Sequence, residues 1–332
     1  MNGMKDTKTY KDILEIPALL RKFDEINSSL PSFLKKNDEF FLIGRGSSGN
    51  ATLFAKYIWE SYCGKISNIV HPFSIFNLKK NFNMKGRTVF SFSQSGRSYD
   101  VVECTKRLKK MGANIVAVTN EPNLKKNTLA SISDFHILLS NSPEIPVAAT
   151  KSFLLQLWAI LRISNFLGSG FPQTRFKKSI EEIEWVIKNF ERIIKLDTEM
   201  LIRSRVVGFI GRGPFNAICE DAALKFREMA QLQTLAYSAA EFLHGPIGAF
   251  TKRDYVVILS RGKKLTDDLK LVSDKLSIRK VCWCAVKPFS DNYPFNTLAV
   301  DVFMKLVALY VSVKKGLNPD NPVGLSKITY TF

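Results

Sequence analysis

Residues 86–100 read GRTVFSFSQSGRSYD, and this stretch decides the fold. The β-branched and aromatic run at residues 89–92 has the composition of a buried strand. After a turn at residues 93–98, apolar residues recur at helical spacing over residues 99–111. The stretch therefore predicts a strand, a hydroxyl-rich turn and a helix, in that order.

The turn at residues 93–98, with the sequence SQSGRS, joins a strand end to a helix start. Free backbone N–H groups and the positive end of the helix dipole favour an anion at such a position. Three serines and a glutamine add neutral donors, and Gly96 lets the backbone approach a ligand closely. We expect this turn to bind a phosphate group on a small molecule. The alternative is a helix N-cap without a ligand, because serine is a preferred capping residue.

Similar units surround this one. Residues 40–43 predict a strand that runs into the turn GRGSSGN at residues 44–50, and a helix follows over residues 51–63. This turn resembles a dinucleotide fingerprint, but its third glycine falls too early and no acidic ribose partner follows a second strand. We therefore interpret it as a second turn that binds a small anion or a hydroxyl group. Strands at 66–70, 115–119 and 135–139, alternating with helices, predict a parallel sheet covered on both faces.

The chain repeats itself halfway along. Residues 207–214 (VGFIGRGP) match residues 40–47 (FFLIGRGS), which indicates a gene duplication in a chain of 332 residues. The second copy has SRGKK at residues 260–264 in place of the hydroxyl cluster, so we expect the first copy alone to bind phosphate. We expect an N-terminal helix and first subdomain at 1–167, a linker and connecting helix at 168–200, and a second subdomain with its tail at 201–332. Further elements are expected as helices at 9–27, 147–167 and 176–201 and as strands at 255–259 and 280–286.

Composition limits the class of protein. The first sixteen residues lack an uninterrupted apolar core, so we expect no signal peptide. The most apolar late stretch, at residues 297–313, is interrupted by Asp301 and Lys305, and no segment is expected to reach the length of a membrane span. We therefore expect a cytoplasmic protein with no membrane partner. The net charge of +18 is spread along the chain, which favours anionic metabolites over nucleic acid.

The five cysteines are scattered, and the chain has only three histidines, so we expect neither a metal site nor another cofactor. Cys282 and Cys284 flank a tryptophan in a predicted strand, which would place both thiols on one face. We expect the cysteines to be reduced thiols that pack as small hydrophobic residues.

The second half carries three groups of reactive side chains. Lys225 and Glu228 are three residues apart and share a helix face. His244 precedes a Gly-Pro turn and follows Glu241 closely, and the tail at residues 318–329 is a polar segment that could fold over a site. Taken alone, the first pair is more often a solvated ion pair, and a single histidine is more often structural.

Six motifs together resemble the sugar isomerase (SIS) domain family, in particular the isomerase half of glucosamine-6-phosphate synthase and the stand-alone amino-sugar phosphate deaminases and fructosamine deglycases. These motifs, which follow one another in the same order over nearly the whole chain, are GRGSS, SQSGRS, VAATKSF, ALKFRE, SAAEFLHGP and the terminal NPDNP…LSK. The resemblance implies an α/β fold of two tandem flavodoxin-like SIS subdomains related by a pseudo-twofold axis. It also implies a homodimer with sites near the dimer interface.

The resemblance further implies that a hexose 6-phosphate or amino-sugar 6-phosphate is the ligand. The implied substrate-binding residues are Gly46, Ser47, Ser48, Ser93, Gln94, Ser95, Ser98, Val147, Ala149 and Ser326. By the same resemblance Glu228 moves the proton between C1 and C2, with Lys225 beside it. His244, reaching in from the other subunit, would assist ring opening. Lys327 would contact the open-chain sugar or form an imine with its ketone.

Two departures from the synthase pattern affect the expected reaction. The glutaminase domain with its N-terminal cysteine is absent from these 332 residues, and Ala149 stands where the synthase pattern has a serine. The first departure favours deamination, the conversion of glucosamine 6-phosphate to fructose 6-phosphate and ammonia. A fructosamine 6-phosphate deglycase, an isomerase alone and a non-catalytic sugar-phosphate sensor remain open as alternatives.

Overall fold

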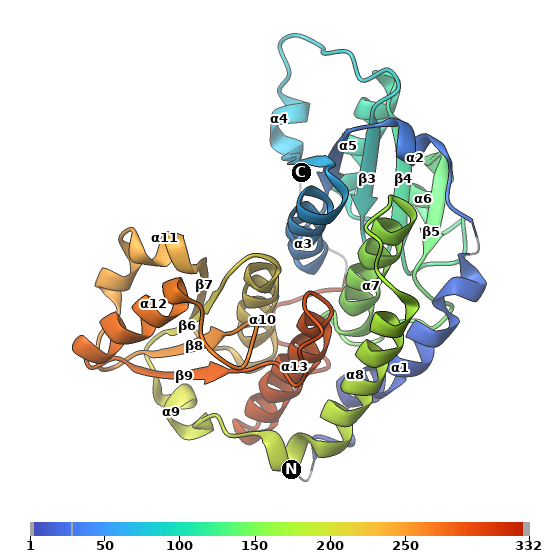
Figure 1. The fold of residues 1–332 in the computed structure, drawn as a ribbon. Helices are drawn as coiled ribbons and strands as arrows, with labels where there is room; N and C mark the ends of the chain where they lie inside the picture. Colours follow the sequence, from blue (N-terminus) through green and yellow to red (C-terminus); the bar gives the residue numbers. More distant parts are fainter. Residues whose placement is uncertain (1–2, 28, 328–332) are drawn as a thin grey trace. The chain divides into compact units, whose positions relative to one another are not determined.

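A computed structural model describes residues 3–27 and 29–327 (Figure 1). The chain forms two compact units, each with its own parallel sheet. Among the described residues, the first-sheet unit comprises 18–144, 151–171 and 326–327, and the second-sheet unit comprises 3–17, 145–150 and 172–325. Two parallel sheets flanked by helices confirm the predicted α/β fold class.

Five parallel strands of the described chain form the first sheet in the order β2-β1-β3-β4-β5. This is the flavodoxin-like order, in which the strand sequence reverses between the first and third strands. The strands are β1 (Glu39–Ile43), β2 (Ile66–Ile69), β3 (Thr88–Phe92), β4 (Asn114–Thr119) and β5 (Phe135–Leu138). The accompanying helices are α1 (Lys8–Ile26, which contributes to both units), α2 (Phe33–Lys36), α3 (Ser47–Cys63), α4 (Pro72–Phe76), α5 (Tyr99–Lys110), α6 (Thr128–Ile132) and α7 (Lys151–Phe166).

The strands of the first sheet are hydrophobic on both faces because helices cover both. On one face, Phe40 packs edge-on against Trp59 of α3 and against Phe90 of β3. The Trp59 indole donates to the Ile160 carbonyl of α7 at 3.3 Å, which ties α3 to α7. On the other face, residues of α4, α5 and α6 form a second buried cluster with Val89 and neighbouring strand residues.

The second-sheet unit repeats this plan with four strands in the described residues, in the order β7-β6-β8-β9. Its strands are β6 (Val207–Gly211), β7 (Thr234–Ser238), β8 (Tyr255–Leu259) and β9 (Cys282–Val286). Its helices are α8 (Gln173–Ile193), α9 (Thr198–Arg203), α10 (Pro214–Ala230), α11 (Ala239–Leu243), the 3-10 helix Pro246–Ala249, α12 (Asp267–Ile278) and α13 (Asn296–Lys314). Helices α10 and α13 pack against each other, and α13 also packs against α8.

Helix α13 is long and apolar enough, by length and composition, to cross a membrane, so the expectation that no segment reaches that length is wrong. However, 89% of its most apolar 18-residue window is buried inside the protein. The helix is hydrophobic on all sides because it is enclosed by other elements, as core helices are.

Several other expectations differ from the structure. The helix expected at 176–201 is two helices, α8 and α9, because the Asp197 side chain accepts the Met200 N–H at 2.9 Å and caps a new helix start. The helix expected from residue 147 begins only at Lys151. Strand β7 was not predicted. All five cysteines are free, but Cys282 is exposed and so does not pack as a core residue.

Candidate functional site

The turn after β1 presents two serines at the start of α3. Gly46 precedes the helix with φ 53° and ψ −132°, a left-handed conformation that favours glycine. Ser47 and Ser48 follow, each 8% exposed. The Ser48 hydroxyl accepts a hydrogen bond from the Gln156 side-chain amide of α7 at 2.9 Å. This bond fixes the hydroxyl in the first helical turn, the part of a helix that favours an anion.

The turn after β3 is held by its own hydroxyl groups. The Ser93 hydroxyl accepts the Gly96 N–H at 3.1 Å and lies 3.2 Å from the Ser98 hydroxyl. The Ser95 hydroxyl accepts the Arg97 N–H at 3.3 Å. Ser98 occupies the N-cap position of α5, but its side chain makes no capping bond. The Ser98 side chain therefore does not cap α5, although a serine N-cap was the alternative interpretation of this turn.

Gly96 allows this turn to pack tightly. Its φ is +65°, and a Cβ added there would lie 1.9 Å from the Asn127 side-chain oxygen. That oxygen accepts the Ala130 N–H at 3.0 Å, because Asn127 caps α6. A side chain at position 96 would displace this cap, so glycine is required for the close approach.

The two turns lie at the same edge of the first sheet. Strands β1 and β3 are parallel neighbours with Ile43 opposite Ser91, so their carboxyl ends carry the two turns next to each other. An ion pair between Arg45 and Asp100 joins the first turn to the start of α5. Ligands of doubly wound sheets bind outside the carboxyl ends of the strands, where the strand order reverses. The predicted phosphate-binding serines occupy this position.

The second-sheet unit holds the predicted acid–base pair. The Lys225 ammonium forms an ion pair with the Glu228 carboxylate within α10. The Lys225 side chain is 1% exposed and the Glu228 side chain 22% exposed. A surface ion pair, which was the alternative interpretation of this spacing, would expose both side chains. The pair instead has a buried cation beside a carboxylate that solvent can reach.

His244 ends α11, and its backbone N–H contacts the carbonyls of Ala240 and Glu241 at 3.2 and 3.1 Å. Gly245 and the 3-10 helix follow at once, as the Gly-Pro motif predicts. The side chains of His244 and Glu241 are exposed in this chain. His244 is therefore available to a ligand or to another subunit.

The tail at residues 318–325 is fixed to the start of α1. The Asp320 carboxylate accepts the N–H groups of Lys8 and Thr9, both at 2.8 Å, and the Thr9 hydroxyl at 2.7 Å. The Asp320 carbonyl accepts the Val147 N–H at 3.2 Å, which holds the half-buried segment that includes Ala149. The tail therefore orders the segment with the predicted substrate contacts Val147 and Ala149.

Lys327, in the first-sheet unit, meets a carboxylate that the sequence analysis missed. Its ammonium lies 3.1 Å from the Glu144 carboxylate, whose side chain is fully buried. Glu144 also accepts the Ser152 N–H at 3.0 Å and the Ser152 hydroxyl at 2.6 Å at the start of α7. The predicted contact Ser326 is exposed. Two features of the sequence could have identified the residues that were missed. Glu144 is an acidic residue just before the VAATKSF motif, and Gln156 is a lone glutamine in an apolar helix.

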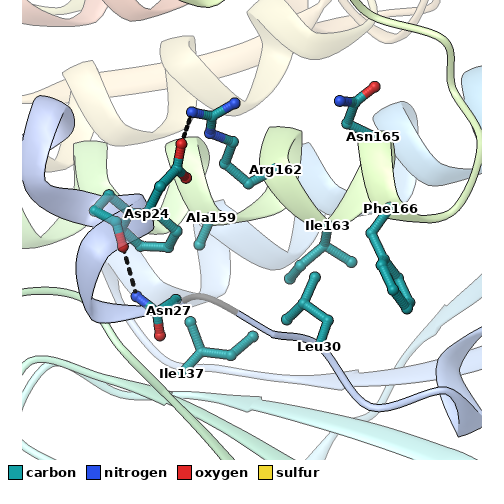
Figure 2. A pocket seen from close by; sticks show the side chains of 10 residues that line it. Asp24, Asn27, Leu30, Ile137, Ala159, Arg162, Ile163, Asn165 and Phe166 are labelled. Atoms are coloured by element: carbon teal, nitrogen blue, oxygen red, sulfur yellow. Dashed lines mark hydrogen bonds and ion pairs between the residues drawn. The ribbon is translucent and has the colours of Figure 1, made fainter.

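A separate cavity of about 270 Å³ lies in the first-sheet unit between the end of α1, β5 and α7 (Figure 2). Figure 2 shows Arg162 paired with Asp24 in this cavity. The Asn27 amide donates to the Phe23 carbonyl at 3.2 Å. The residues that line it in the described chain include none of the predicted site residues. We therefore consider the strand-end turns of the first-sheet unit and α10 of the second-sheet unit, each by itself, as the candidate functional regions.

The predicted residues fall into two sets. The first-sheet unit holds Gly46, Ser47, Ser48, Ser93, Gln94, Ser95, Ser98, Ser326 and Lys327, and the second-sheet unit holds Val147, Ala149, Lys225, Glu228 and His244. Each set contains residues that lie close together within their own unit. In the first-sheet unit these residues lie in the two neighbouring turns, and in the second-sheet unit they are Lys225 and Glu228, which form an ion pair.

The two sheets have the same strand order, and the motif that follows β1 recurs after β6. This repetition places the molecule among the tandem α/β proteins that arise by duplication. The chain belongs to the SIS domain family. The SIS domain of that family matches residues 33–162 and 200–286.

Comparisons with known proteins agree with this assignment. A glutamine–fructose-6-phosphate aminotransferase (isomerizing) of Sulfolobus acidocaldarius is 30% identical over 96% of this chain and 54% of its own length. The corresponding protein of Sulfurisphaera tokodaii is 29% identical over 94% and 53%. The chain spans about half the length of the curated relatives it matches.

Solved structures share the fold. The C-terminal domain of a glucosamine-fructose-6-phosphate aminotransferase from Francisella tularensis has a TM-score of 0.82 at 22% identity, over 96% of this chain and 98% of that domain. A glucosamine-6-phosphate deaminase from Thermotoga maritima has a TM-score of 0.80 at 23% identity, over 98% and 100%.

Proposed function

We propose that this protein is a phosphosugar isomerase that deaminates an amino-sugar 6-phosphate, with glucosamine 6-phosphate and water giving fructose 6-phosphate and ammonia. The observation that carries the proposal is the ion pair of buried Lys225 with solvent-accessible Glu228. An aldose–ketose interconversion needs a carboxylate base near the substrate carbon and a cation that stabilises the enolate oxygen. The names of the similar proteins, an isomerizing aminotransferase and a glucosamine-6-phosphate deaminase, support this reaction class.

The phosphate group is assigned to the first-sheet turns. Ser93, Ser95 and Ser48 are buried yet carry hydroxyl groups at the carboxyl ends of neighbouring strands. Two helix starts, of α3 and α5, supply backbone N–H groups there. In the proposal, the serines of the first-sheet unit bind the phosphate, and Glu228 of the second-sheet unit acts on the reacting carbons.

The chemistry follows from these positions. With the ring open, Glu228 removes the C2 proton of the amino aldose, the electron pair moves toward the C1 oxygen, and this oxygen takes up a proton from solvent to form an enolamine. Glu228 returns the proton to C1 while the nitrogen electron pair forms the C2=N bond, which gives the protonated ketimine at C2. Water adds to this ketimine and ammonia leaves, which yields fructose 6-phosphate. Lys225 stabilises the negative charge that develops during proton removal, because its ammonium lies beside the base.

His244 and Lys327 have separate roles in the proposal. His244 is exposed, which suits a residue that opens the sugar ring in the site of a second subunit of a homodimer. Lys327 is oriented by the buried Glu144 carboxylate, which supports a role as the cation that contacts the open-chain sugar. Inactive Glu228→Ala and His244→Ala subunits, mixed as verified heterodimers, should then regain part of the activity.

The proposal is tested by ammonia release from a panel of 6-phosphorylated sugars: glucosamine, galactosamine, N-acetylglucosamine and fructosamine derivatives. We expect ammonia and fructose 6-phosphate from glucosamine 6-phosphate, and no turnover of unphosphorylated glucosamine. Release from the fructosamine alone would identify a deglycase, and interconversion of hexose 6-phosphates alone an isomerase. Binding without turnover of any member would identify a sensor and refute the enzyme proposal.

A further inference from the structure

One face of α10 carries a row of charged side chains. Asp221, Lys225 and Glu228 occupy positions i, i+4 and i+7, which share one face of a helix. The Asp221 and Lys225 side chains are 0% and 1% exposed, and Glu228 lies at the more accessible end of the row. The row therefore leads from the buried interior of the second-sheet unit to the proposed base.

Helix α13 meets this row with two charges of its own. Asp301 and Lys305 are one helical turn apart and are 2% and 1% exposed. The Lys305 ammonium donates to the Asp221 carboxylate at 2.9 Å and to both oxygens of Asp301 at 2.5 Å. Lys305 thus binds the two helices together through two carboxylates.

This arrangement is costly for stability alone. Burial of charged groups carries a desolvation penalty, and apolar residues of similar volume often give an equally stable or more stable protein. Helix α13 is otherwise so apolar that it meets the criteria for a membrane-spanning helix. Charged residues at positions 301 and 305 therefore call for an explanation beyond packing.

The cluster acts electrostatically on the proton-transfer pair. Burial has the largest influence on Asp301 and raises the pKa of its carboxyl group, whereas the Lys305 and Lys225 ammonium groups lower that pKa. Lys225 follows Asp221 by one helical turn on the same face of α10, and Asp221 accepts the bond from Lys305, so Lys225 lies next to this cluster. Lys225 is therefore attracted both by Glu228 and by the negative charge of the aspartates.

We propose that Lys305 is a positioning residue: with Asp221 and Asp301 it holds the Lys225 ammonium beside Glu228 and so orients the Glu228 carboxylate. The inference rests on the proposed role of Glu228 as the base. Loss of Lys305 would leave the two aspartates with Lys225 as their neighbouring cation in this cluster. The ammonium would move toward them, and the Glu228 carboxylate would lose its fixed orientation.

Two variants separate positioning from stability. Lys305→Met should lower the melting temperature, because buried carboxylates lose their counter-ion, and should lower kcat about tenfold to a hundredfold with KM unchanged. The neutral triple variant Asp221→Asn/Asp301→Asn/Lys305→Met leaves no carboxylate in the cluster to draw Lys225 away from Glu228, so the melting temperature should recover and kcat and C2-proton exchange should recover at least in part. A wild-type kcat in folded Lys305→Met, or no gain of kcat in the triple variant over Lys305→Met, would overturn the proposal.

The control is another ion pair in the same unit that contains a buried carboxylate. Arg205 contacts Asp254 at 2.9 Å, and the Asp254 side chain is fully buried just before β8, at the sheet edge away from the strand-end turns. Arg205→Met/Asp254→Asn should change the melting temperature and leave kcat unchanged. An equal loss of kcat in this control would show that the Lys305 effect is not specific, which also contradicts the proposal.

A crystal structure of Lys305→Met tests the inference independently of the reaction. We expect the Lys225 ammonium to be displaced from the Glu228 carboxylate toward the two aspartates, and an unchanged ion pair would overturn the positioning role. If the wild-type protein converts no member of the sugar panel, or if Glu228→Gln keeps full proton exchange, the proposed function fails. The crystal structure still decides whether Lys305 positions Lys225.

Discussion

The first and second halves of the chain share a backbone plan but differ in their side chains. Gly46 precedes α3 with φ 53° and ψ −132°, and Gly213 precedes α10 with φ 59° and ψ −135°. Both helices are 17 residues long. A Cβ added at Gly44 or Gly211 would lie 2.4 or 2.8 Å from the carbonyl oxygen four residues later. The duplication therefore preserved the turn geometry closely.

The side chains in these turns have diverged. The Ser48 hydroxyl of the first half corresponds to Phe215, whose ring stacks on Tyr293 with centroids 6.4 Å apart. In the first half, the Ser93 hydroxyl faces that of Ser98, whereas the Ser260 hydroxyl of the second half donates to the Gly262 carbonyl of its own loop at 2.8 Å. When these equivalent turns are compared, those of the first half carry the hydroxyl groups that could bind a ligand.

The helix after each turn shows the opposite difference. In α3, Lys56 pairs with Glu60 at 2.6 Å, and the two side chains are 39% and 36% exposed. In α10, Glu228 lies one position beyond the equivalent of Glu60, and its lysine partner is buried. Similar backbones therefore carry a hydroxyl-rich turn in one copy and a buried lysine beside a glutamate in the other. We infer that function was divided between the copies by changes of side chain.

The largest expected effect concerns the two glutamates. Glu228→Gln keeps the shape of the side chain but removes the base, so kcat should fall about 10²- to 10⁴-fold with KM nearly unchanged. Exchange of the substrate C2 proton with deuterated solvent, followed by NMR, should stop. The control variant Glu60→Gln, at the exposed glutamate of α3, should leave both rates unchanged. Wild-type exchange in Glu228→Gln would move the base elsewhere, and Glu241 would be tested next.

The serines give the next largest effect. Loss of a hydrogen bond to a charged group costs about 1.5–3 kcal/mol, so Ser95→Ala should raise KM roughly tenfold to a hundredfold with kcat little changed. Ser260→Ala in the second half should leave KM unchanged, because that hydroxyl is bonded within its own loop. Steady-state kinetics with glucosamine 6-phosphate measure both values. Equal KM values for Ser95→Ala and the wild type would contradict the phosphate assignment.

The sequence predicted those elements whose signal is local. The strand and helix of the opening stretch were expected at 89–92 and 99–111 and occur at Thr88–Phe92 and Tyr99–Lys110. Strand β7 was missed because it is an edge strand with exposed Leu235, so it lacks the continuous apolar run of a buried strand. The break after α8 was missed because one side-chain cap, at Asp197, decides it.

The candidate site was predictable only in part, for a similar reason. Lys225 and Glu228 could be paired from their spacing because both lie on one helix. The contact of Glu144 with Lys327 joins residues 183 positions apart, and that of Lys305 with Asp221 joins residues 84 apart. No local pattern encodes such contacts, because they depend on how the elements pack.

The glycines before the two helices should give smaller and equal effects. Gly46→Ala and Gly213→Ala each place a side chain in the same left-handed conformation, at a cost of about 1–3 kcal/mol. Denaturant unfolding of the two variants should therefore give similar losses of stability, if the two turns still share one backbone. A loss in one variant alone would show that the turns have diverged in backbone as well as in side chains.

The smallest effects concern the arginine in each turn. Each half has one such arginine that pairs with an aspartate, but the two aspartates differ in exposure. Arg45 pairs with Asp100, and Arg212 lies 3.2 Å from Asp268; each acid lies in the first turn of the following helix. Both arginines are about half exposed, so solvent screening limits each pair to about 0–1 kcal/mol.

The acids differ, because the Asp100 side chain is 10% exposed and the Asp268 side chain 32%. A double-mutant cycle of Arg45→Ala with Asp100→Ala should therefore give the larger coupling, near the upper end of that range. The cycle of Arg212→Ala with Asp268→Ala should give a coupling energy close to zero. Addition of 1 M salt should lower the coupling energy of the Arg45–Asp100 pair by more kcal/mol than that of the Arg212–Asp268 pair. Equal couplings in the two cycles would mean that burial of the acid does not strengthen the pair. The Arg45–Asp100 link would then be a remnant of the duplication and not a support for the serine turn.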